Sequence, residues 1–323
     1  MDKPQHIIIS RTDNIGDVVL TLPLTVLLKQ SYPNCKISFL ARSYVKDLVL
    51  NSLAVDAFIN WDEIKDLPEE AAIKILQQSA ADTILHVFPN KKIASLAKVA
   101  GIKTRIGSSH RWYHWLTCNK RVNFSRKNST LHEAQLNLKL LQPLELPTIL
   151  SLSDLTTLLR INQNKALSEK IVQFLKCDRF NLVVHPLTNG NTKEWPLTNF
   201  IELIQALPIE KFNVIITGTA AEEQRLQSLL QQCPTVKNAI TQLSLQDFIA
   251  LLSHADGIVA NSTGPLHIAA ALGIYTLGLY PTERGKDVSR WGPLGGKVET
   301  LSAAEMRQIT IRQVEQIIQS WLI

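Results

Sequence analysis

The sequence predicts an α/β protein of two domains, each organised around a doubly wound parallel sheet. Short apolar strands alternate with segments of helical periodicity in both halves of the chain. In each half, one of these strands leads through a polar turn directly into a helix. A length of 323 residues accommodates two domains of ordinary size, and 45% hydrophobic with 19% charged residues is typical of a folded protein.

The first strand–turn–helix unit lies at the N-terminus. His6–Ser10 is a short β-branched strand, and the polar turn 11–17 follows it. Apolar residues then recur at helical spacing with Pro23 inside the pattern, so the helix is either kinked there or begins near Thr21. Lys36–Ala41 is the next strand. This strand–helix–strand order predicts parallel pairing with a right-handed crossover.

The same alternation continues through the first half. Further strands are expected over 57–60, 83–87 and 104–107, and helices over 68–79, 93–100 and 132–141. The segment 143–164 has no clear period and carries two prolines. We therefore place the domain boundary near residue 160, which gives domains 1–160 and 161–323.

The second half repeats the pattern. Strands are expected over 180–185, 213–217, 258–260 and 275–279, and helices over 165–175, 197–207, 222–232, 244–253 and the segment from Pro265. A terminal amphipathic helix over 306–323 could pack back on the first domain. Two such halves in tandem predict a cleft between the carboxyl ends of their strands, where small ligands bind in α/β sheets.

The second strand–turn–helix unit centres on the segment 261–267, with the sequence NSTGPLH. Ser262 or Thr263 is expected to cap the helix with a side-chain oxygen, Pro265 suits the first helical turn, and Gly273 suits the helix end. A helix start presents free N–H groups and a positive dipole, for which phosphate is the usual ligand. An ordinary capped turn is the alternative, and the local chemistry alone favours it.

Charge is distributed unevenly along the chain. Residues 1–150 contain 19 Lys and Arg against 13 Asp and Glu, whereas 151–323 contain 15 of each kind. Within the first half, 83–132 carries ten basic and no acidic residues, with Trp112, Tyr113 and Trp115 interleaved. Such a stretch is either a solvated basic face or a surface for an anionic partner: nucleic acid, anionic lipid or a phosphorylated glycan.

The sequence lacks the signatures of several functional classes. No apolar stretch is long enough to span a bilayer, and the first residues lack the pattern of a signal peptide. The four cysteines are far apart without metal-ligand spacing, so we expect reduced thiols in a cytoplasmic protein. The glycine fingerprint of dinucleotide-binding proteins and the P-loop lysine motif are missing, as are HExxH and GxSxG. A dehydrogenase or a P-loop enzyme is therefore not expected.

Five motifs, in order along nearly the whole chain, resemble those of the bacterial heptosyltransferase family, glycosyltransferase family 9. They are GDVVLTLP from Gly16, His132-Glu133 with Asn137, Lys193-x-Trp195-Pro196, the segment from Ser262 to Ala270, and Arg290-Trp291-Gly292-Pro293. The resemblance implies a GT-B fold, in which two Rossmann-like doubly wound domains face each other across a cleft. Domain 1–160 would bind the acceptor and domain 161–323 the nucleotide-sugar donor.

The resemblance also implies an inverting glycosyltransferase that needs neither a metal nor a cofactor. The reaction that we expect first from this resemblance is the transfer of heptose from ADP-heptose to a lipopolysaccharide core acceptor. An inverting displacement needs a base that takes the acceptor proton. By resemblance this base is Asp17, with Asp13 as a rival, and Gly16 would let the acceptor approach the backbone. The alternative for Asp17 is an acid that only complements a helix dipole.

Without a metal, protein charges and dipoles must stabilise the leaving diphosphate. The residues implied in donor binding are Thr188, Thr192, Lys193, Glu222, Ser262, Thr263, Gly264 and His267. Glu223 is an alternative to Glu222 for the ribose hydroxyls, and both could be ordinary surface acids. Lys193 could be a solvated loop lysine, and His267 could simply pack. Many family members have an aspartate in place of Ser262, so another nucleotide sugar remains open as the donor.

The basic stretch fits the acceptor side of this reaction. We expect Arg111, Lys120 and Arg121 to bind an anionic lipopolysaccharide core at the cytoplasmic face of the inner membrane. The expected partners are a nucleotide sugar, an anionic glycolipid and the membrane surface, to which the enzyme would bind peripherally. Nucleic acid is not expected as a partner. One alternative is a related enzyme that turns over the donor alone, such as a sugar-nucleotide epimerase. Another is a non-catalytic protein that binds anionic glycans or nucleic acid.

Overall fold

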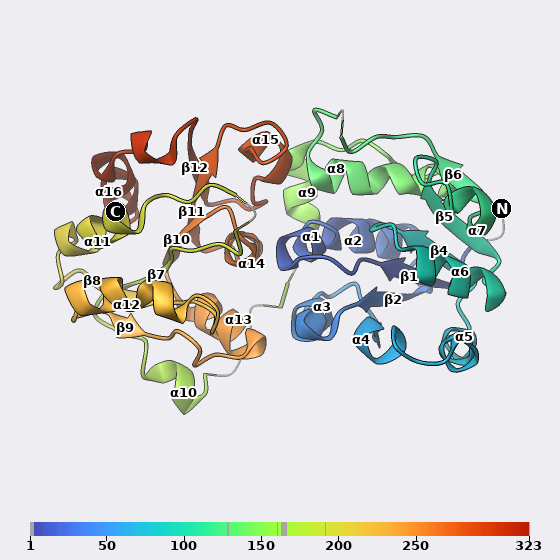
Figure 1. Cartoon of the computed structure of the whole chain (residues 1–323), viewed down its shortest axis with the longest axis horizontal. Helices are drawn as coiled ribbons and strands as arrows, with labels where there is room; N and C mark the ends of the chain where they lie inside the picture. Colours follow the sequence, from blue (N-terminus) through green and yellow to red (C-terminus); the bar gives the residue numbers. More distant parts are fainter. Residues whose placement is uncertain (1–2, 128, 160, 163–166, 191, 323) are drawn as a thin grey trace. The chain divides into compact units, whose positions relative to one another are not determined.

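The computed structural model describes residues 3–127, 129–159, 161–162, 167–190 and 192–322. The chain divides into two compact units, Met1–Ile161 and Asn162–Ile323 (Figure 1). This division falls within the segment 143–164, on whose irregular sequence the boundary prediction near residue 160 is based.

The first unit is built on a six-stranded sheet in the order β3-β2-β1-β4-β5-β6. All neighbouring strands run parallel, and Ile7 at the centre lies between Ile37 and Thr83. The strands are β1 (His6–Ser10), β2 (Lys36–Ala41), β3 (Ala57–Asn60), β4 (Thr83–His86), β5 (Thr104–Ser108) and β6 (Lys120–Val122). Every residue of β1 is buried, as expected for a central strand covered by helices on both faces.

The helices of the first unit follow the predicted periodicity in most places. They are α1 (Ile15–Val19), α2 (Leu22–Ser31), α3 (Lys46–Leu50), α4 (Trp61–Ile64), α5 (Glu69–Gln78), α6 (Lys91–Val99), α7 (His114–Thr117), α8 (Glu133–Leu138) and α9 (Leu152–Leu158), with 3₁₀ turns at Ser43–Val45 and Lys139–Leu144. The first helical pattern is two helices rather than one kinked helix, because Pro23 is the second residue of α2. The expected helix 132–141 ends earlier, at Leu138, and a 3₁₀ turn containing Pro143 continues it.

The second unit repeats the architecture with the order β12-β11-β10-β7-β8-β9, again with all neighbours parallel. Its strands are β7 (Phe180–His185), β8 (Phe212–Ile216), β9 (Lys237–Asn238), β10 (Gly257–Asn261), β11 (Tyr275–Pro281) and β12 (Val298–Ala303). Its helices are α10 (Glu169–Val172), α11 (Leu197–Ala206), α12 (Glu223–Gln232), α13 (Leu245–His254), α14 (Gly264–Leu272), α15 (Val288–Trp291) and α16 (Ile311–Ser320), with a 3₁₀ turn at Met306–Gln308. The prediction of two doubly wound α/β halves is confirmed.

Two helix predictions in this unit are wrong in extent. The helix expected over 165–175 is helical only in α10, and residues 163–166 lie outside the described residues. The helix expected over 306–323 is interrupted, because Thr310 has extended backbone and its side chain caps α16 at Gln313. Val314 and Ile318 of α16 belong to the core of the second unit, where this helix contacts α11.

The strand orders place one switch point in each sheet. The chain winds outward in opposite directions from β1 and β4 in the first unit, and from β7 and β10 in the second. The connections that leave these neighbouring strands diverge to opposite sides, which opens a crevice at their carboxyl ends. The polar turns after β1, β7 and β10 are therefore where ligands are expected.

Candidate active site

The carboxyl end of β1 leads into Asp17 within a few residues. Asn14 has extended backbone and α1 begins at Ile15, which places Asp17 in the first helical turn. The Asp17 side chain is mostly buried and its Oδ1 accepts a hydrogen bond from Arg11 Nη2. Its Oδ2 lies 3.5 Å from Asn14 Nδ2, at the outer limit of a hydrogen bond. Oδ2 is therefore the oxygen better placed to accept a proton.

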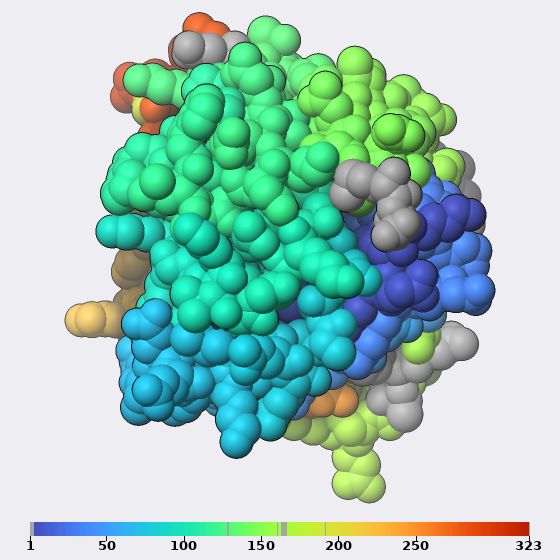
Figure 2. All heavy atoms as spheres, turned by 90° about the vertical axis from the view of Figure 1, so that its right-hand side faces the viewer, coloured from blue at the N-terminus to red at the C-terminus, as the bar shows by residue number. Residues whose placement is uncertain are grey.

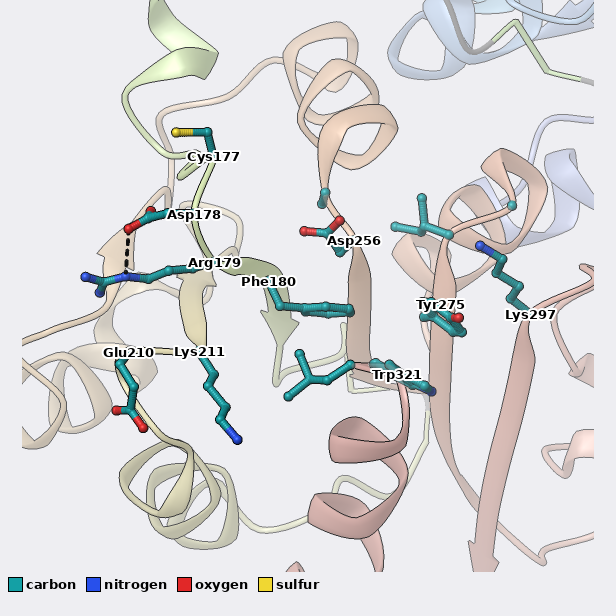
Figure 3. A pocket seen from close by; sticks show the side chains of 14 residues that line it. Cys177, Asp178, Arg179, Phe180, Glu210, Lys211, Asp256, Tyr275, Lys297 and Trp321 are labelled. Atoms are coloured by element: carbon teal, nitrogen blue, oxygen red, sulfur yellow. Dashed lines mark ion pairs between the residues drawn. The ribbon is translucent and has the colours of Figure 1, made fainter.

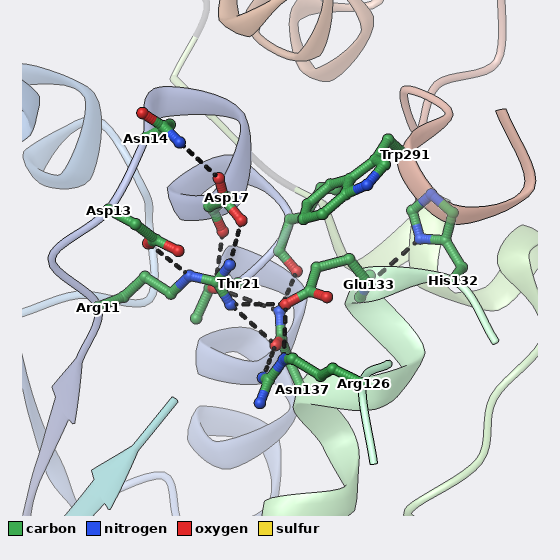
Figure 4. A network of polar contacts seen from close by, with 12 residues as sticks. Arg11, Asp13, Asn14, Asp17, Thr21, Arg126, His132, Glu133, Asn137 and Trp291 are labelled. Carbon is green, nitrogen blue, oxygen red and sulfur yellow. Dashed lines mark hydrogen bonds and ion pairs between the residues drawn. The ribbon is translucent and has the colours of Figure 1, made fainter. Parts of the chain in front are cut away.

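Arg11 is the centre of a buried network that binds Asp17 to the rest of the unit (Figure 4). Its Nε donates to Asp13 Oδ1 at 2.7 Å, and its Nη1 donates to Glu133 Oε1 at 2.9 Å and Asn137 Oδ1 at 3.1 Å. Asn137 in turn donates to the Leu20 carbonyl at 3.1 Å. The end of β1 is thereby joined to α8, more than a hundred residues later in the chain.

A second arginine, Arg126 in the segment before α8, contacts the same two side chains of that helix. Arg126 Nε donates to Glu133 Oε1 at 3.1 Å and Arg126 Nη2 to Asn137 Oδ1 at 2.9 Å. Glu133 is almost fully buried, and its Oε1 accepts hydrogen bonds from both guanidinium groups. Arg11, Arg126 and their role were missed from the sequence, although the motif His132-Glu133 with Asn137 contained two of the network's members.

The electrostatics of this network act on Arg11 and on Asp13. Burial lowers the pKa of the Arg11 guanidinium, but the carboxylates around it, Asp13 foremost, outweigh this effect and raise the pKa above its ordinary value. Burial raises the pKa of Asp13 to about 6 from 3.8; the Asp17 carboxylate adds to this shift and Arg11 opposes it. Asp13 therefore has the acid–base properties of a rival base, as the sequence allowed.

In the second unit, Asn261 joins the two loops at the switch point. Its Oδ1 accepts from the Trp195 amide at 2.8 Å and its Nδ2 donates to the Pro186 carbonyl at 2.6 Å. The loop 186–195 after β7 is thus attached to the end of β10. The residues predicted in donor binding on these two segments, Thr188, Thr192, Lys193, Ser262, Thr263 and Gly264, come from neighbouring strand ends.

The start of α14 differs from the predicted cap. Thr263 is the N-cap residue with φ −151°, but no side-chain hydrogen bond from it caps the helix, so the prediction of a Ser262 or Thr263 cap is wrong. Among the residues that the structure describes, the first turn of α14 therefore keeps N–H groups that the N-cap side chain does not bind, as an anion site requires. The other end follows the prediction, because Gly273 adopts a left-handed conformation with φ 76°.

The loop residues differ in how they are held. Thr188 is buried, and its N–H and hydroxyl both donate to Glu194 Oε1, at 2.7 and 2.9 Å. Lys193 is half-exposed; its Nζ contacts Glu305 Oε1 at 2.8 Å and the Ala304 carbonyl at 3.1 Å. Thr192 Oγ1 is buried without a hydrogen-bond partner in the described part of the chain. Glu194, whose other oxygen pairs with Arg225, was missed from the sequence.

Trp195 explains why the Lys193-x-Trp195-Pro196 motif folds as it does. Its ring is fully buried, donates from Nε1 to the Ile309 carbonyl at 2.8 Å, and packs edge-on against Phe200 at 4.7 Å between centroids. The motif therefore anchors the loop in the core and leaves Lys193 at the surface.

Of the remaining residues predicted in donor binding, two are buried. Glu222 is buried at the N-cap of α12, where Oε2 accepts from the Thr219 N–H at 2.7 Å and hydroxyl at 2.9 Å. Glu223 is exposed in the first turn of the same helix. His267 is buried in α14. Since Glu222 closes its own turn, Glu223 is the less committed of the two acids.

The predicted acceptor residues lie away from the switch point of the first sheet. Lys120 and Arg121 belong to the edge strand β6, and Arg111 precedes α7. Gly16 and Asp17 follow the central strand β1. The structure thus forms two separate groups within the first unit: the Asp17 network and an exposed basic edge.

A pocket of about 770 Å³ lies at the amino ends of β7, β10 and β11, the sheet edge opposite the 261–267 turn (Figure 3). Stacked rings of Phe180, Trp321 and Tyr275 line it, with Tyr275 and Trp321 5.4 Å apart at 16°. None of the predicted site residues lines this pocket. In the described ranges, no group of three or more His, Cys, Asp or Glu side chains is placed to hold a metal ion, and no helix has the length and hydrophobicity to cross a membrane.

Comparison with known proteins gives a consistent result. The model of glycosyltransferase family 9 (heptosyltransferase) matches residues 70–320. Lipopolysaccharide heptosyltransferase 3 of Escherichia coli is 22% identical over 314 residues, which cover 92% of this chain and 88% of that protein. The crystal structure of a family 9 glycosyltransferase from Veillonella parvula superposes with a TM-score of 0.82 at 16% identity, covering 100% of this chain and 98% of that one. The E. coli heptosyltransferase WaaC with ADP superposes with a TM-score of 0.77 at 20% identity, covering 98% and 99%.

Proposed function

Because the chain belongs to glycosyltransferase family 9 and is a glycosyltransferase of the GT-B fold, we propose that it transfers heptose from ADP-heptose to a lipopolysaccharide core acceptor. The relatives support this donor and acceptor, since one is a lipopolysaccharide heptosyltransferase and another has been solved with ADP. Each unit contributes one observation that supports the proposal. The first unit holds a buried, oriented carboxylate at Asp17. In the second unit, a helix start without a side-chain cap from Thr263 follows the strand that neighbours the one before the Lys193 loop.

The proposed reaction is a single inverting displacement that uses no metal. The acceptor hydroxyl oxygen forms a bond to the anomeric carbon as the bond from that carbon to the diphosphate oxygen breaks. Asp17 takes the hydroxyl proton on Oδ2. Arg11 keeps the carboxylate oriented by its hydrogen bond to Oδ1. Gly16 beside it leaves the acceptor room to approach the backbone.

We assign stabilisation of the leaving diphosphate to the second unit. The N–H groups at Thr263 and Gly264 and the dipole of α14 would receive its negative charge, and Lys193 would contribute a cation. Lys193 can exchange its exposed partner Glu305 for a phosphate, since ion pairs between exposed side chains are weak and screened by solvent. Thr188, Thr192, Ser262 and His267 would line the site, and Glu223 or Glu222 would accept from the ribose.

The acceptor is proposed to bind through the first unit, with Arg111, Lys120 and Arg121 attracting its phosphates. We propose that the enzyme works at the cytoplasmic face of the inner membrane as a peripheral protein. The acid-free stretch 83–132 supports this location, because the surface of that leaflet is anionic.

Calorimetric titration with ADP, UDP and GDP tests the donor assignment. Selective ADP binding is expected, and Lys193→Ala should weaken it by about 10- to 100-fold, the effect of one hydrogen bond to a charged group. Lys211→Ala, an exposed lysine in the same unit, is the control and should bind ADP normally. Preference for UDP or GDP would keep the reaction class and change the donor, as Ser262 allows. Absence of binding to all three would refute the proposal.

A further inference from the structure

Three large apolar side chains protrude together around α7. Trp112 is 65% exposed, Trp115 59% and Leu116 64%, and we call these three residues the tryptophan patch. The segment that carries them, coloured teal to green, forms much of the face turned to the viewer in Figure 2. Isolated exposed apolar residues are ordinary, but three within five positions form a local apolar surface.

The backbone under the patch is firmly held. His114, between the two tryptophans, is fully buried and its Nδ1 lies 2.9 Å from the Ser108 carbonyl. A Cβ at Gly107 would lie 2.6 Å from that ring, so the ring packs directly on the β5 backbone. Trp115 Nε1 donates to the Ser109 carbonyl at 2.9 Å. The patch is therefore presented by a fixed turn rather than by a loose loop.

Cations surround the patch closely. Lys91 Nζ lies 5.0 Å from the ring centre of Trp112, and the Arg121 guanidinium lies 4.5 Å from that of Trp115. The whole stretch 83–132 holds ten Lys and Arg residues and no acid. The surface thus combines exposed apolar side chains with positive charges that lie over two of their rings.

We infer that the tryptophan patch inserts into the interface of an anionic phospholipid bilayer. The inference deepens the proposed docking on the inner membrane, on which it rests. Tryptophan is favoured at headgroup depth, leucine is favoured below it, and lysine and arginine attract anionic headgroups. Leu116 has no use in stacking on a nucleic-acid base, and Lys91 and Arg121 already lie over the tryptophan rings. The membrane is therefore favoured over a nucleic acid.

Vesicle co-sedimentation of the full chain tests the inference without any nucleotide. Wild-type protein is expected to bind vesicles of phosphatidylethanolamine and phosphatidylglycerol, with a blue shift of tryptophan fluorescence, and to bind phosphatidylcholine vesicles poorly. The triple variant Trp112→Ser, Trp115→Ser, Leu116→Ser should bind at least about tenfold more weakly. Ile149→Ser and Ile209→Ser, which change residues 66% and 52% exposed outside the patch, form the control and should bind as wild type.

Other results would overturn it. Equal vesicle binding by the triple variant would exclude insertion, and so would preferential binding of single-stranded RNA by the wild type. Turnover of a delipidated core acceptor separates this inference from the proposed function. The triple variant should retain wild-type turnover of that soluble acceptor, whereas loss of it would indicate a damaged fold. Vesicle binding by a wild-type protein that transfers no sugar would refute the proposed function and leave the patch assignment standing.

Discussion

Glu133 joins the two arginines of the Asp17 network. It is almost fully buried and accepts from two guanidinium groups, Arg11 at 2.9 Å and Arg126 at 3.1 Å. Removal of one partner from a buried ion pair costs roughly 3–5 kcal/mol, because the other charge is left uncompensated. Since Arg11 keeps Asp13 and Asp17, Glu133→Ala should cost about 3 kcal/mol of the free energy of unfolding, at the lower end of that range.

Glu133→Gln refines this expectation. Glutamine keeps the volume and one acceptor oxygen, so only the part of each hydrogen bond that depends on the charge is lost. Hydrogen bonds to charged groups contribute about 1.5–3 kcal/mol and neutral ones about 0.5–1.5 kcal/mol, a difference of roughly 1–1.5 kcal/mol per bond. Hydrogen exchange measured by mass spectrometry on the full chain checks both values, because peptides from β1 and α8 report the local free energy of opening. Peptides from the second unit serve as an internal standard in the same experiment.

A matched substitution shows whether burial is the cause. Glu70→Ala removes an exposed acid of α5 and should leave the protection of β1 unchanged. Glu133→Gln should also lower kcat more than it raises KM, since Asp17 loses part of its orientation while the donor site is untouched. Wild-type protection of β1 in Glu133→Ala would refute the network's role.

Three further predictions concern single groups. Asp17→Asn should retain ADP affinity in calorimetry and lose turnover in a sugar-transfer assay, whereas Asp13→Asn should keep measurable turnover; the reverse order would make Asp13 the base. Burial lowers the pKa of His86 to about 3 from 6.5, and the neighbouring His114 and Arg105 lower it further in the same direction. The unfolded chain therefore binds a proton at this residue before the folded chain does. The free energy of unfolding should fall as the pH drops below 6.5, by up to about 1.4 kcal/mol per pH unit. Urea titrations from pH 7 to about 4 should therefore show a shallower loss for His86→Leu than for wild type, with the exposed His110→Gln unchanged. Gly107→Ala should cost roughly 1–3 kcal/mol in the same titrations, since its Cβ would lie 2.6 Å from His114 Nδ1, whereas Gly296→Ala, with nothing within 4 Å, should be neutral.

The elements with strong local signals could be predicted from the sequence. The strand His6–Ser10 is a short β-branched apolar run, and the helix Gly264–Leu272 has Pro265 in its first turn and Gly273 at its C-cap, where their backbone conformations are required. The edge strands β6, β9 and β12 were not predicted. They are short or have side chains that are only partly buried, so neither length nor alternation distinguishes them from loops.

The local geometry of the candidate site could be predicted where one segment forms it, but not where distant segments meet. Asp17 and the 261–267 turn each follow directly from a strand and a helix start. The bond between Arg11 and Glu133 spans 122 residues, and no local pattern indicates it. The N-cap of α14 was mispredicted because Ser and Thr favour capping only on average: Thr263 has the extended backbone usual at an N-cap, but its side chain makes no capping hydrogen bond.

The division of the chain at Ile161 has a consequence for biogenesis. Each sheet draws its six strands from one continuous half of the sequence, although neighbours such as β1 and β4 pair Ile7 with Thr83, far along the chain. Parallel pairings over such separations form slowly, because a long loop must close before the contacts reward it. All partners of the first sheet have left the ribosome before the second begins to emerge. The N-terminal half can therefore complete its slow strand pairing during synthesis, without competition from the similar strands that follow.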